Sequence, residues 1–314
     1  MDALLILTSG AYTTVQDKGR YGYQQMGVPV SGALDAFAFY AANMLVGNPD
    51  NAAALEITIM GPCLEILTDA HIAVTGAEMG MTLNDQPVQG WKSIRVKPGD
   101  ILNIRQVKSG CRAYLAVSGG IDVPQVMGSR STYAGGKLGG YKGRPLQEGD
   151  MIQCGKTKLL TKLRQFPSDM IPLYPLEIVI RAIPGPQNDF FHEGLDTIFQ
   201  SDYMISTKAD RMGYRLQGPK IKLREGMPKS IISEPTMPGG VQIPADEQPI
   251  ILLVEQTVGG YTKIVTVIST DLPKVAQATP GDTIRFEKVT LEKAHSLYHD
   301  QKKLMQTLAD QLSE

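Results

Sequence analysis

The chain has 314 residues, a net charge of −1 at pH 7 and 20% charged residues. This near-neutral balance gives no basic field that would favour nucleic-acid binding. There is no run of about 18 apolar residues, so we expect no membrane span and predict a cytoplasmic protein. The three cysteines, Cys63, Cys111 and Cys154, are far apart and form no C-x-x-C pair, which favours reduced thiols over a disulfide scaffold.

The first third of the chain combines glycine turns with polar side chains around one predicted helix. The turns run over residues 10–23 and 27–35, and a polar segment follows at 41–48. Between the turns, residues 33–46 carry apolar side chains at helical spacing, which predicts a helix. Either Ser31 or Asp35 is suitable to cap the start of this helix.

Short apolar alternations separated by turn residues recur through the rest of the chain, which is typical of strands. Glycine and proline, at 32 and 20 residues, also favour a turn-rich β protein. The fold class is therefore predicted to be mainly β, with few helices. The predicted strands cover residues 53–59, 63–67, 71–74, 93–96, 101–105, 114–117, 176–182, 221–223, 250–255, 263–268 and 283–286.

Two weak internal repeats and a break in the apolar rhythm predict two β-barrel halves. The sequence from Arg20 to Tyr23 resembles that from Arg211 to Tyr214, and residues 61–66 resemble 218–223. Charges and prolines interrupt the strand pattern between residues 156 and 175. We predict an N-terminal half at 1–165, a C-terminal half at 166–290 and a C-terminal helix at 291–314.

Standard nucleotide and metal motifs are missing from the sequence. Gly135-Gly-Lys137 is followed by leucine and lacks the first glycine of a P-loop. His295 and His299 have helical spacing, but they have no third ligand nearby in the sequence. We therefore predict no metal site.

What remains is a set of glycine-flanked polar clusters that could bind a small molecule. Arginine can hold a carboxylate, carbonate or phosphate with two hydrogen bonds. Glutamine and serine donate to a developing oxyanion, and glycine lets the backbone approach a ligand closely. The same residues also have structural interpretations, such as turn caps and an ion-pair corner at Arg211 and Arg215. The predicted catalytic residues are Arg20, Arg130, Arg211 and Gln256, and the predicted substrate-binding residues are Gln16, Asn43, Ser131, Tyr214, Gln242, Gly259, Gly260 and Tyr261.

Taken together, these clusters resemble the biotin-dependent carboxyltransferase family of allophanate-hydrolase-subunit-2-like proteins. The resemblance extends from Thr13-Thr-Val-Gln-Asp-x-Gly-Arg20, through Gly128-Ser-Arg-Ser-Thr132 and Arg211-x-Gly-Tyr-Arg-Leu216, to Pro280-Gly-Asp282. The family includes the carboxyltransferase region of urea carboxylase, the KipA protein and the C subunit of bacterial ATP-dependent 5-oxoprolinase. The resemblance implies two cyclophilin-like β-barrel halves.

One motif departs from the family pattern. Members often read Asp-x-Gln-Thr-Thr-Gly-Gly-Tyr-Pro, whereas this chain has Val254-Glu-Gln-Thr-Val-Gly-Gly-Tyr-Thr262. Gln256, Gly259, Gly260 and Tyr261 match the pattern, and the acidic residue and the second threonine do not.

By this resemblance, the chain is expected to act as the C subunit of an ATP-dependent 5-oxoprolinase. It would work with a smaller subunit like KipI or PxpB to activate the 5-oxoproline lactam, and a third subunit like PxpA would complete hydrolysis to glutamate. ATP would be used in the complex, and the isolated chain would be inactive. The three arginines would hold the substrate carboxylate or the phosphoryl group, while Gln242, Gln256 and Tyr261 would orient the lactam amide.

Two alternatives share the same fold. In the first, the chain moves a carboxyl group from carboxybiotin to a urea-like or amide-like acceptor. The arginines would then hold carbonate, and Ser131 and Gln256 would stabilise the ureido oxyanion. In the second, the chain is a KipA-like regulator that binds a kinase inhibitor. The sequence leaves all three functions open.

Overall fold

The computed structural model of the protein describes residues 1–156 and 158–313. The chain divides into two compact units, each with its own sheet. The first unit contains Met1–Arg20, Ser31–Tyr174 and the chain from Thr307 onward, and the second contains Tyr21–Val30 and Pro175–Gln306. The predicted division at residues 165 and 290 stays a prediction.

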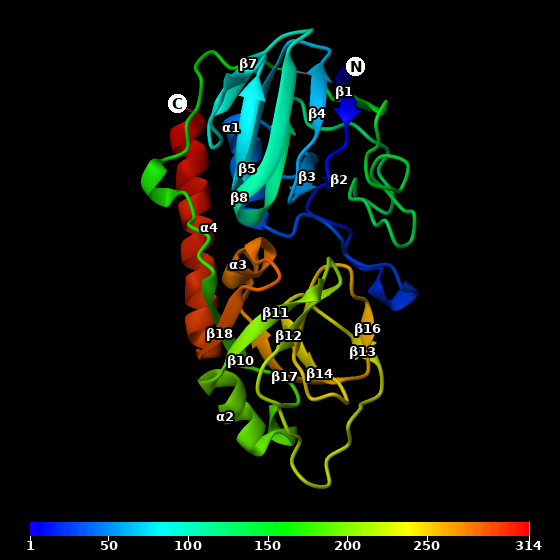
Figure 1. Ribbon diagram of the computed structural model, residues 1–314, viewed down its shortest axis with the longest axis vertical. Helices are drawn as coiled ribbons and strands as arrows, with labels where there is room; N and C mark the ends of the chain where they lie inside the picture. The colour runs from blue at the N-terminus through cyan, green and yellow to red at the C-terminus, as the bar shows by residue number, and fades with distance from the viewer. Residues whose placement is uncertain (157, 314) are drawn as a thin grey trace. The chain divides into compact units, whose positions relative to one another are not determined.

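The first unit is built on a sheet of nine strands within the described residues (Figure 1). The strand order is β2-β3-β8-β4-β1-β9; β5 also pairs with β8, and β6 and β7 pair with β5. All of its named pairings are antiparallel. The strands are β1 (Asp2–Thr8), β2 (Tyr12–Gln16), β3 (Ala54–Thr58), β4 (Cys63–Ile66), β5 (Ala70–Leu83), β6 (Gln86–Pro87), β7 (Ser93–Val96), β8 (Ile101–Val117) and β9 (Met151–Gln153).

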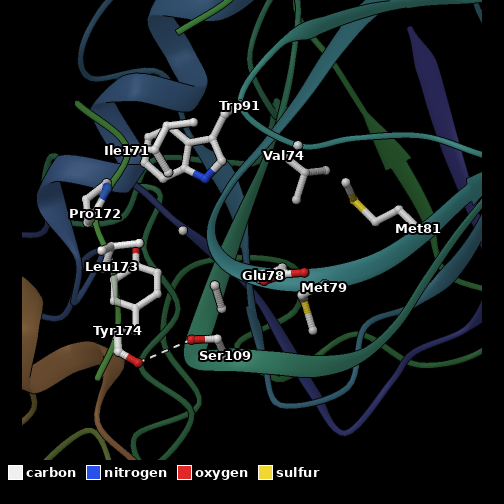
Figure 2. Close-up of a pocket in the computed structure, with 13 residues that line it drawn as sticks. Val74, Glu78, Met79, Met81, Trp91, Ser109, Ile171, Pro172, Leu173 and Tyr174 are labelled. Atoms are coloured by element: carbon white, nitrogen blue, oxygen red, sulfur yellow. Dashed lines mark hydrogen bonds between the residues drawn. The ribbon is translucent and has the colours of Figure 1, made fainter. Parts of the chain in front are cut away.

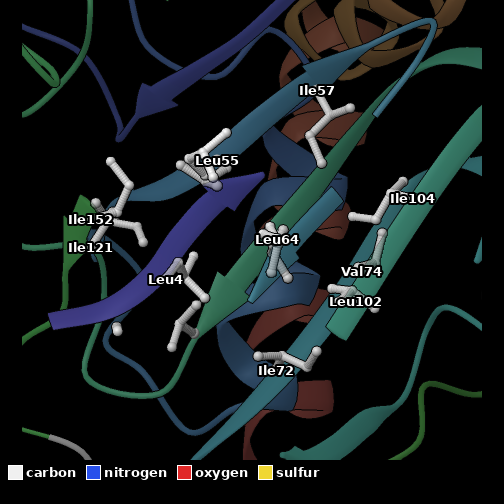
Figure 3. Packing of buried hydrophobic residues seen from close by; sticks show 14 of the residues in the cluster. Leu4, Leu55, Ile57, Leu64, Ile72, Val74, Leu102, Ile104, Ile121 and Ile152 are labelled. Carbon is white, nitrogen blue, oxygen red and sulfur yellow. The ribbon is translucent and has the colours of Figure 1, made fainter. Parts of the chain in front are cut away.

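Alternating aliphatic side chains of these strands form the core of the first unit. Figure 3 shows Leu4, Leu55 and Leu64 packed together with Ile72 and Leu102, all at most 1% exposed. They come from five strands, β1, β3, β4, β5 and β8. Because side chains alternate between the two faces of a strand, this pattern buries one face of the sheet.

One helix, α1 (Ala36–Leu45), packs against β5 and β8. The Asp35 carboxylate accepts a hydrogen bond from Ala38 N at 2.9 Å, so Asp35 rather than Ser31 is the N-cap. The predicted helix began three residues too early because Asp35, the N-cap, has a non-helical ψ of 89°. A 3₁₀ turn, η2 (Ser168–Met170), lies near the end of this unit.

The second unit is a closed barrel in the order β10-β17-β14-β15-β12-β11-β18, with a separate two-stranded ribbon, β13 and β16. The barrel closes through the parallel pair β10–β18. Its strands are β10 (Glu177–Pro184), β11 (Asp202–Ala209), β12 (Gly213–Gln217), β14 (Gly240–Ile243), β15 (Ile250–Leu252), β17 (Thr262–Val267) and β18 (Thr283–Lys288), and the ribbon is β13 (Glu234–Pro235) and β16 (Val258–Gly259).

The remaining elements are short except for the C-terminal helix. They are η1 (Gln24–Met26), η3 (Asn188–Phe190), α2 (His192–Gln200), η4 (Ser269–Asp271), α3 (Leu272–Gln277) and α4 (Leu291–Ser313). The predicted mainly β fold with barrel-like halves and a C-terminal helix is confirmed. None of the described helices is long and apolar enough to span a membrane.

Three local predictions were wrong. The predicted strand at 221–223 is irregular: Ile221 N donates to Glu247 O at 3.0 Å, but no ladder follows. The two predicted strands at 101–105 and 114–117 are one long strand, β8, whose charged middle and Gly110 hide its continuity. Helices α2 and α3 were not predicted. Gly194 obscures the pattern of α2, and a Cβ there would lie 2.7 Å from Lys222 O.

Candidate functional site

Asp17 is the centre of a buried polar cluster in the first unit, at the end of β2. Its Oδ1 accepts hydrogen bonds from Ser129 Oγ at 2.6 Å, Ser131 Oγ at 2.5 Å and Gly19 N at 2.8 Å. Its Oδ2 accepts from Arg130 N at 2.5 Å. Both serines are completely buried. This network joins two turns that lie more than 100 residues apart in the sequence.

The predicted residues of the first unit engage this chain's own groups. Arg20, only 1% exposed, donates through Nη2 to Ser131 O. Gln16 donates to Thr132 O at 3.2 Å, and its Oε1 accepts from Gly32 N at 3.1 Å. Asn43 donates to the carbonyl oxygen of residue 52 at 2.9 Å. Gln16, Arg20 and Ser131 are therefore neighbours, while Asn43 fixes the end of α1.

Arg130 is the most accessible predicted residue of the first unit. Its side chain is 32% exposed, Nε donates to Val123 O at 3.0 Å, and Nη2 lies 3.3 Å from Asp122 Oδ1. Asp122 is itself 52% exposed, so water weakens this pair. Arg130 is the predicted arginine in this unit whose present contacts a ligand could most easily replace.

The first unit also contains a cavity of ≈ 200 Å³. Figure 2 shows Trp91, Met79 and Met81 lining it together with the segment Ile171–Tyr174. Ser109 Oγ donates to Tyr174 O at 3.2 Å across one side of it. Burial raises the pKa of Tyr174. None of the predicted site residues lines this cavity.

In the second unit, Arg211 and Tyr214 are buried and bonded to other residues of the same unit. Arg211 Nε lies 2.6 Å from Glu255 Oε1, and both side chains are at most 10% exposed. Tyr214, 1% exposed, donates through its hydroxyl to Ala278 O at 3.3 Å. Of the ion-pair corner considered at Arg211 and Arg215, the structure shows the pair of Arg211 with Glu255.

The other predicted residues of this unit lie on or next to the ribbon of β13 and β16. Gln256 donates to Val258 O at 2.8 Å, and Gly260 O accepts from Ile231 N at 2.8 Å. Tyr261 is 44% exposed. Gly259 is the last residue of β16, and Gln242 lies on the barrel strand β14.

A lysine that was not among the predicted site residues completes this group. Lys263 is 5% exposed, and its Nζ lies 2.5 Å from Glu234 Oε1. Gln187 lies beside the pair, donating to Glu234 Oε1 at 3.4 Å and accepting from Lys263 N at 2.9 Å. The hydrogen bond from Lys263 lowers the pKa of Glu234. The only sequence signal was the position of Lys263 at the end of the Gly259-Gly-Tyr motif.

Neither group of residues has the composition of a metal site. The described residues contain no cluster of three or more His, Cys, Asp or Glu side chains that could hold an ion. The arginines predicted to clamp phosphate already engage a backbone carbonyl or a carboxylate of this chain, as described above. A phosphate would have to displace these contacts, so these arginines do not form a ready binding site for the phosphates of ATP. The predicted site shared by Arg20, Arg130 and Arg211 stays a prediction.

Comparison with known proteins identifies the relatives of the chain. It is 40% identical to the 5-oxoprolinase C subunit of Escherichia coli over 98% of this chain and 97% of that protein. It is 37% identical to the 5-oxoprolinase C subunit of Haemophilus influenzae, covering 93% of each. Urea amidolyase of Lachancea kluyveri is 37% identical, but the chain spans only 18% of its length.

A solved structure agrees with these sequence relatives. The urea carboxylase of Kluyveromyces lactis superposes with a TM-score of 0.91 and 36% identity, covering 98% of this chain and 29% of that one. The family model for the carboxyltransferase domain, subdomain A and B, matches residues 26–288. The resemblance seen in the sequence motifs is confirmed, and the chain belongs to the family of the carboxyltransferase domain, subdomain A and B.

Proposed function

We propose that the chain is the C subunit of an ATP-dependent 5-oxoprolinase and helps to activate the 5-oxoproline lactam for hydrolysis to glutamate. The observation that carries this proposal is the near full-length match, in both directions, to two proteins named as the C subunit of 5-oxoprolinase. The urea amidolyases are nearly as similar, but this chain spans less than a fifth of their length.

The proposal includes partner subunits in the cytoplasm. A smaller KipI-like subunit would supply the ATP site, and a third subunit would complete hydrolysis. Three features support this division of work: the sequence lacks a P-loop, the predicted phosphate arginines have contacts within the chain, and the relatives are named as subunits. The isolated chain is then inactive.

Reconstitution tests the proposal. The chain is mixed with its two candidate partner subunits, and 5-oxoproline-dependent ATP hydrolysis and glutamate formation are measured together. We expect both activities in the complete mixture and neither with this chain alone. ATP hydrolysis that does not depend on 5-oxoproline, or full activity without this chain, would refute the assignment.

Carboxyl transfer is the second candidate because the family model and the superposition with urea carboxylase both favour it. The amide nitrogen of Gln242 and the ammonium group of Lys263 are donors that suit the ureido carbonyl of biotin. Biotin would carry the carboxyl group, and these residues would orient its ring. Transfer of labelled carboxylate from carboxybiotin to urea, in the absence of 5-oxoproline-dependent turnover, would favour this function.

A further inference from the structure

Gln242 and Lys263 are paired across the barrel strands β14 and β17. Directly opposed residues of an antiparallel pair point to the same face of the sheet. Both side chains are buried, at 3% and 5% exposure. The structure therefore brings an amide group and an ammonium group together on one buried surface.

The ribbon of β13 and β16 covers this surface. Glu234 from β13 forms the ion pair with Lys263, and Gly259 from β16 lies against the amide of Gln242. A Cβ at Gly259 would overlap Gln242 Nε2 and would lie 3.3 Å from Thr236 Cγ2. Thr236 follows β13 directly, and its carbonyl oxygen accepts a hydrogen bond from Gln24 at 2.8 Å. This bond holds the end of β13 in place.

Gln242 Nε2 has no hydrogen-bond partner among the described residues, although it is buried. Buried polar groups in folded proteins are nearly always hydrogen-bonded, because an unpaired donor loses its water without compensation. An exception beside a buried ammonium group indicates a place where a ligand supplies the missing acceptor.

The charges of Lys263 and Glu234 indicate that the acceptor atom of the ligand is neutral. Glu234 compensates the charge of Lys263, so the surface offers two N–H donors with little net charge. A carboxylate ligand would be repelled by Glu234, whereas a neutral carbonyl oxygen would not. The side chain of Glu234 is 42% exposed, so the group is reachable from solvent on that side.

We propose that Gln242 and Lys263 bind the carbonyl oxygen of a neutral lactam or amide, and that Gly259 is a positioning residue that holds the Gln242 amide in place. This inference rests on the proposed function, since 5-oxoproline carries such a lactam. The lactam end of the substrate is then bound here and its carboxylate is bound elsewhere. Two preorganised donors on this oxygen stabilise the negative charge that develops when it is activated.

Two glycines in strands provide a matched experiment, Gly259 on β16 and Gly80 on β5. Neither has a positive φ, so alanine is compatible with the backbone at both positions. Gly259→Ala would push the Gln242 amide aside, whereas a Cβ at Gly80 meets only Arg105 Cβ, at 3.8 Å. Gln242→Met removes the donor at similar side-chain length, and Lys263→Met removes the second donor.

Binding of 2-pyrrolidinone, a neutral lactam without a carboxylate, is measured by ligand-observed NMR on the full chain and on its complex with the partner subunits. We expect about tenfold weaker binding in Gly259→Ala, Gln242→Met and Lys263→Met, corresponding to one lost hydrogen bond each, and less than twofold change in Gly80→Ala. Thermal melts identify any variant that has unfolded. In the complex, Gly259→Ala is expected to raise KM for 5-oxoproline and to lower kcat.

The inference is overturned if 2-pyrrolidinone neither binds the chain or complex nor inhibits 5-oxoproline turnover. Equal effects of the two alanine variants would also overturn it, as would acetate binding that the same variants weaken equally. If the reconstituted complex fails to open 5-oxoproline while 2-pyrrolidinone binding follows the expected order, the proposed function fails and the lactam site remains.

Discussion

The Asp17 cluster of the first unit and the Gln242–Lys263 group of the second are both buried polar groups, but they differ in whether their hydrogen bonds are complete. Around Asp17, four N–H and O–H donors converge on the two carboxylate oxygens. In the second unit, one buried amide donor has no acceptor among the described residues. A hydrogen-bond network in which every donor has an acceptor stabilises the fold, whereas a buried donor without an acceptor can bind a ligand. The two groups can therefore be separated by whether a mutation changes stability or binding.

The largest stability effect is expected from Asp17→Ala. This change leaves the two buried serine hydroxyls and the partly buried N–H groups of Gly19 and Arg130 without their shared acceptor. We expect a loss of about 4 kcal/mol in the free energy of unfolding. Urea denaturation measures the loss. Asp122→Ala is the control, since its exposed pair with Arg130 is worth less than about 1 kcal/mol. A loss below about 1 kcal/mol for Asp17→Ala would show that the cluster does not stabilise the first unit.

Gly139→Ala tests the same cluster through packing. Gly139 has a φ of +66°, and a Cβ there would overlap both Ser131 O and the Arg20 guanidinium. Strain and overpacking together should cost about 3 kcal/mol. Gly128→Ala is the matched control, because Gly128 has a φ of +76° but no heavy atom within 4 Å of its Cβ position. Equal losses in the two variants would attribute the cost to φ alone.

Arg130→Ala distinguishes activity from stability within the first unit. Removing one charge-assisted contact to the transition state should cost about 2 kcal/mol, or about thirtyfold in turnover of the reconstituted complex. Its loss of stability should stay below about 1 kcal/mol because the side chain is one-third exposed. Steady-state kinetics and a thermal melt are compared for the same preparation. Unchanged turnover would remove Arg130 from the proposed site.

The sequence predicted the fold class and half of the described strands, because apolar alternation and turn residues are local signals. It also singled out Gln242 and Gly259 as candidate site residues through their motifs, and their role stays a prediction. It could not reveal that Glu234 pairs with Lys263, because their meeting depends on the ribbon of β13 and β16 and the closure of the barrel. Local sequence also could not distinguish Arg20, buried against Ser131 O, from the more accessible Arg130.

The smallest expected effect concerns the pH dependence of stability, through His71. Burial, with a smaller contribution from the charge of Arg95, lowers the pKa of His71. Its Nδ1 accepts a hydrogen bond from Leu160 N at 3.3 Å, which requires the unprotonated nitrogen. The folded state therefore binds this proton less readily than the unfolded state, so stability is complete above about pH 6.5 and is lost as pH falls toward the lower folded pKa. Asp150 and Asp271 also have lowered pKa values, so their protonation also lowers stability as pH falls, but near pH 4.

Urea denaturation between pH 7.5 and 5.5 should show that the stability of the wild type falls with pH. His71→Gln, which has no titrating ring, should show a flatter profile. If the two profiles are parallel, the protonation of His71 does not control stability in this range.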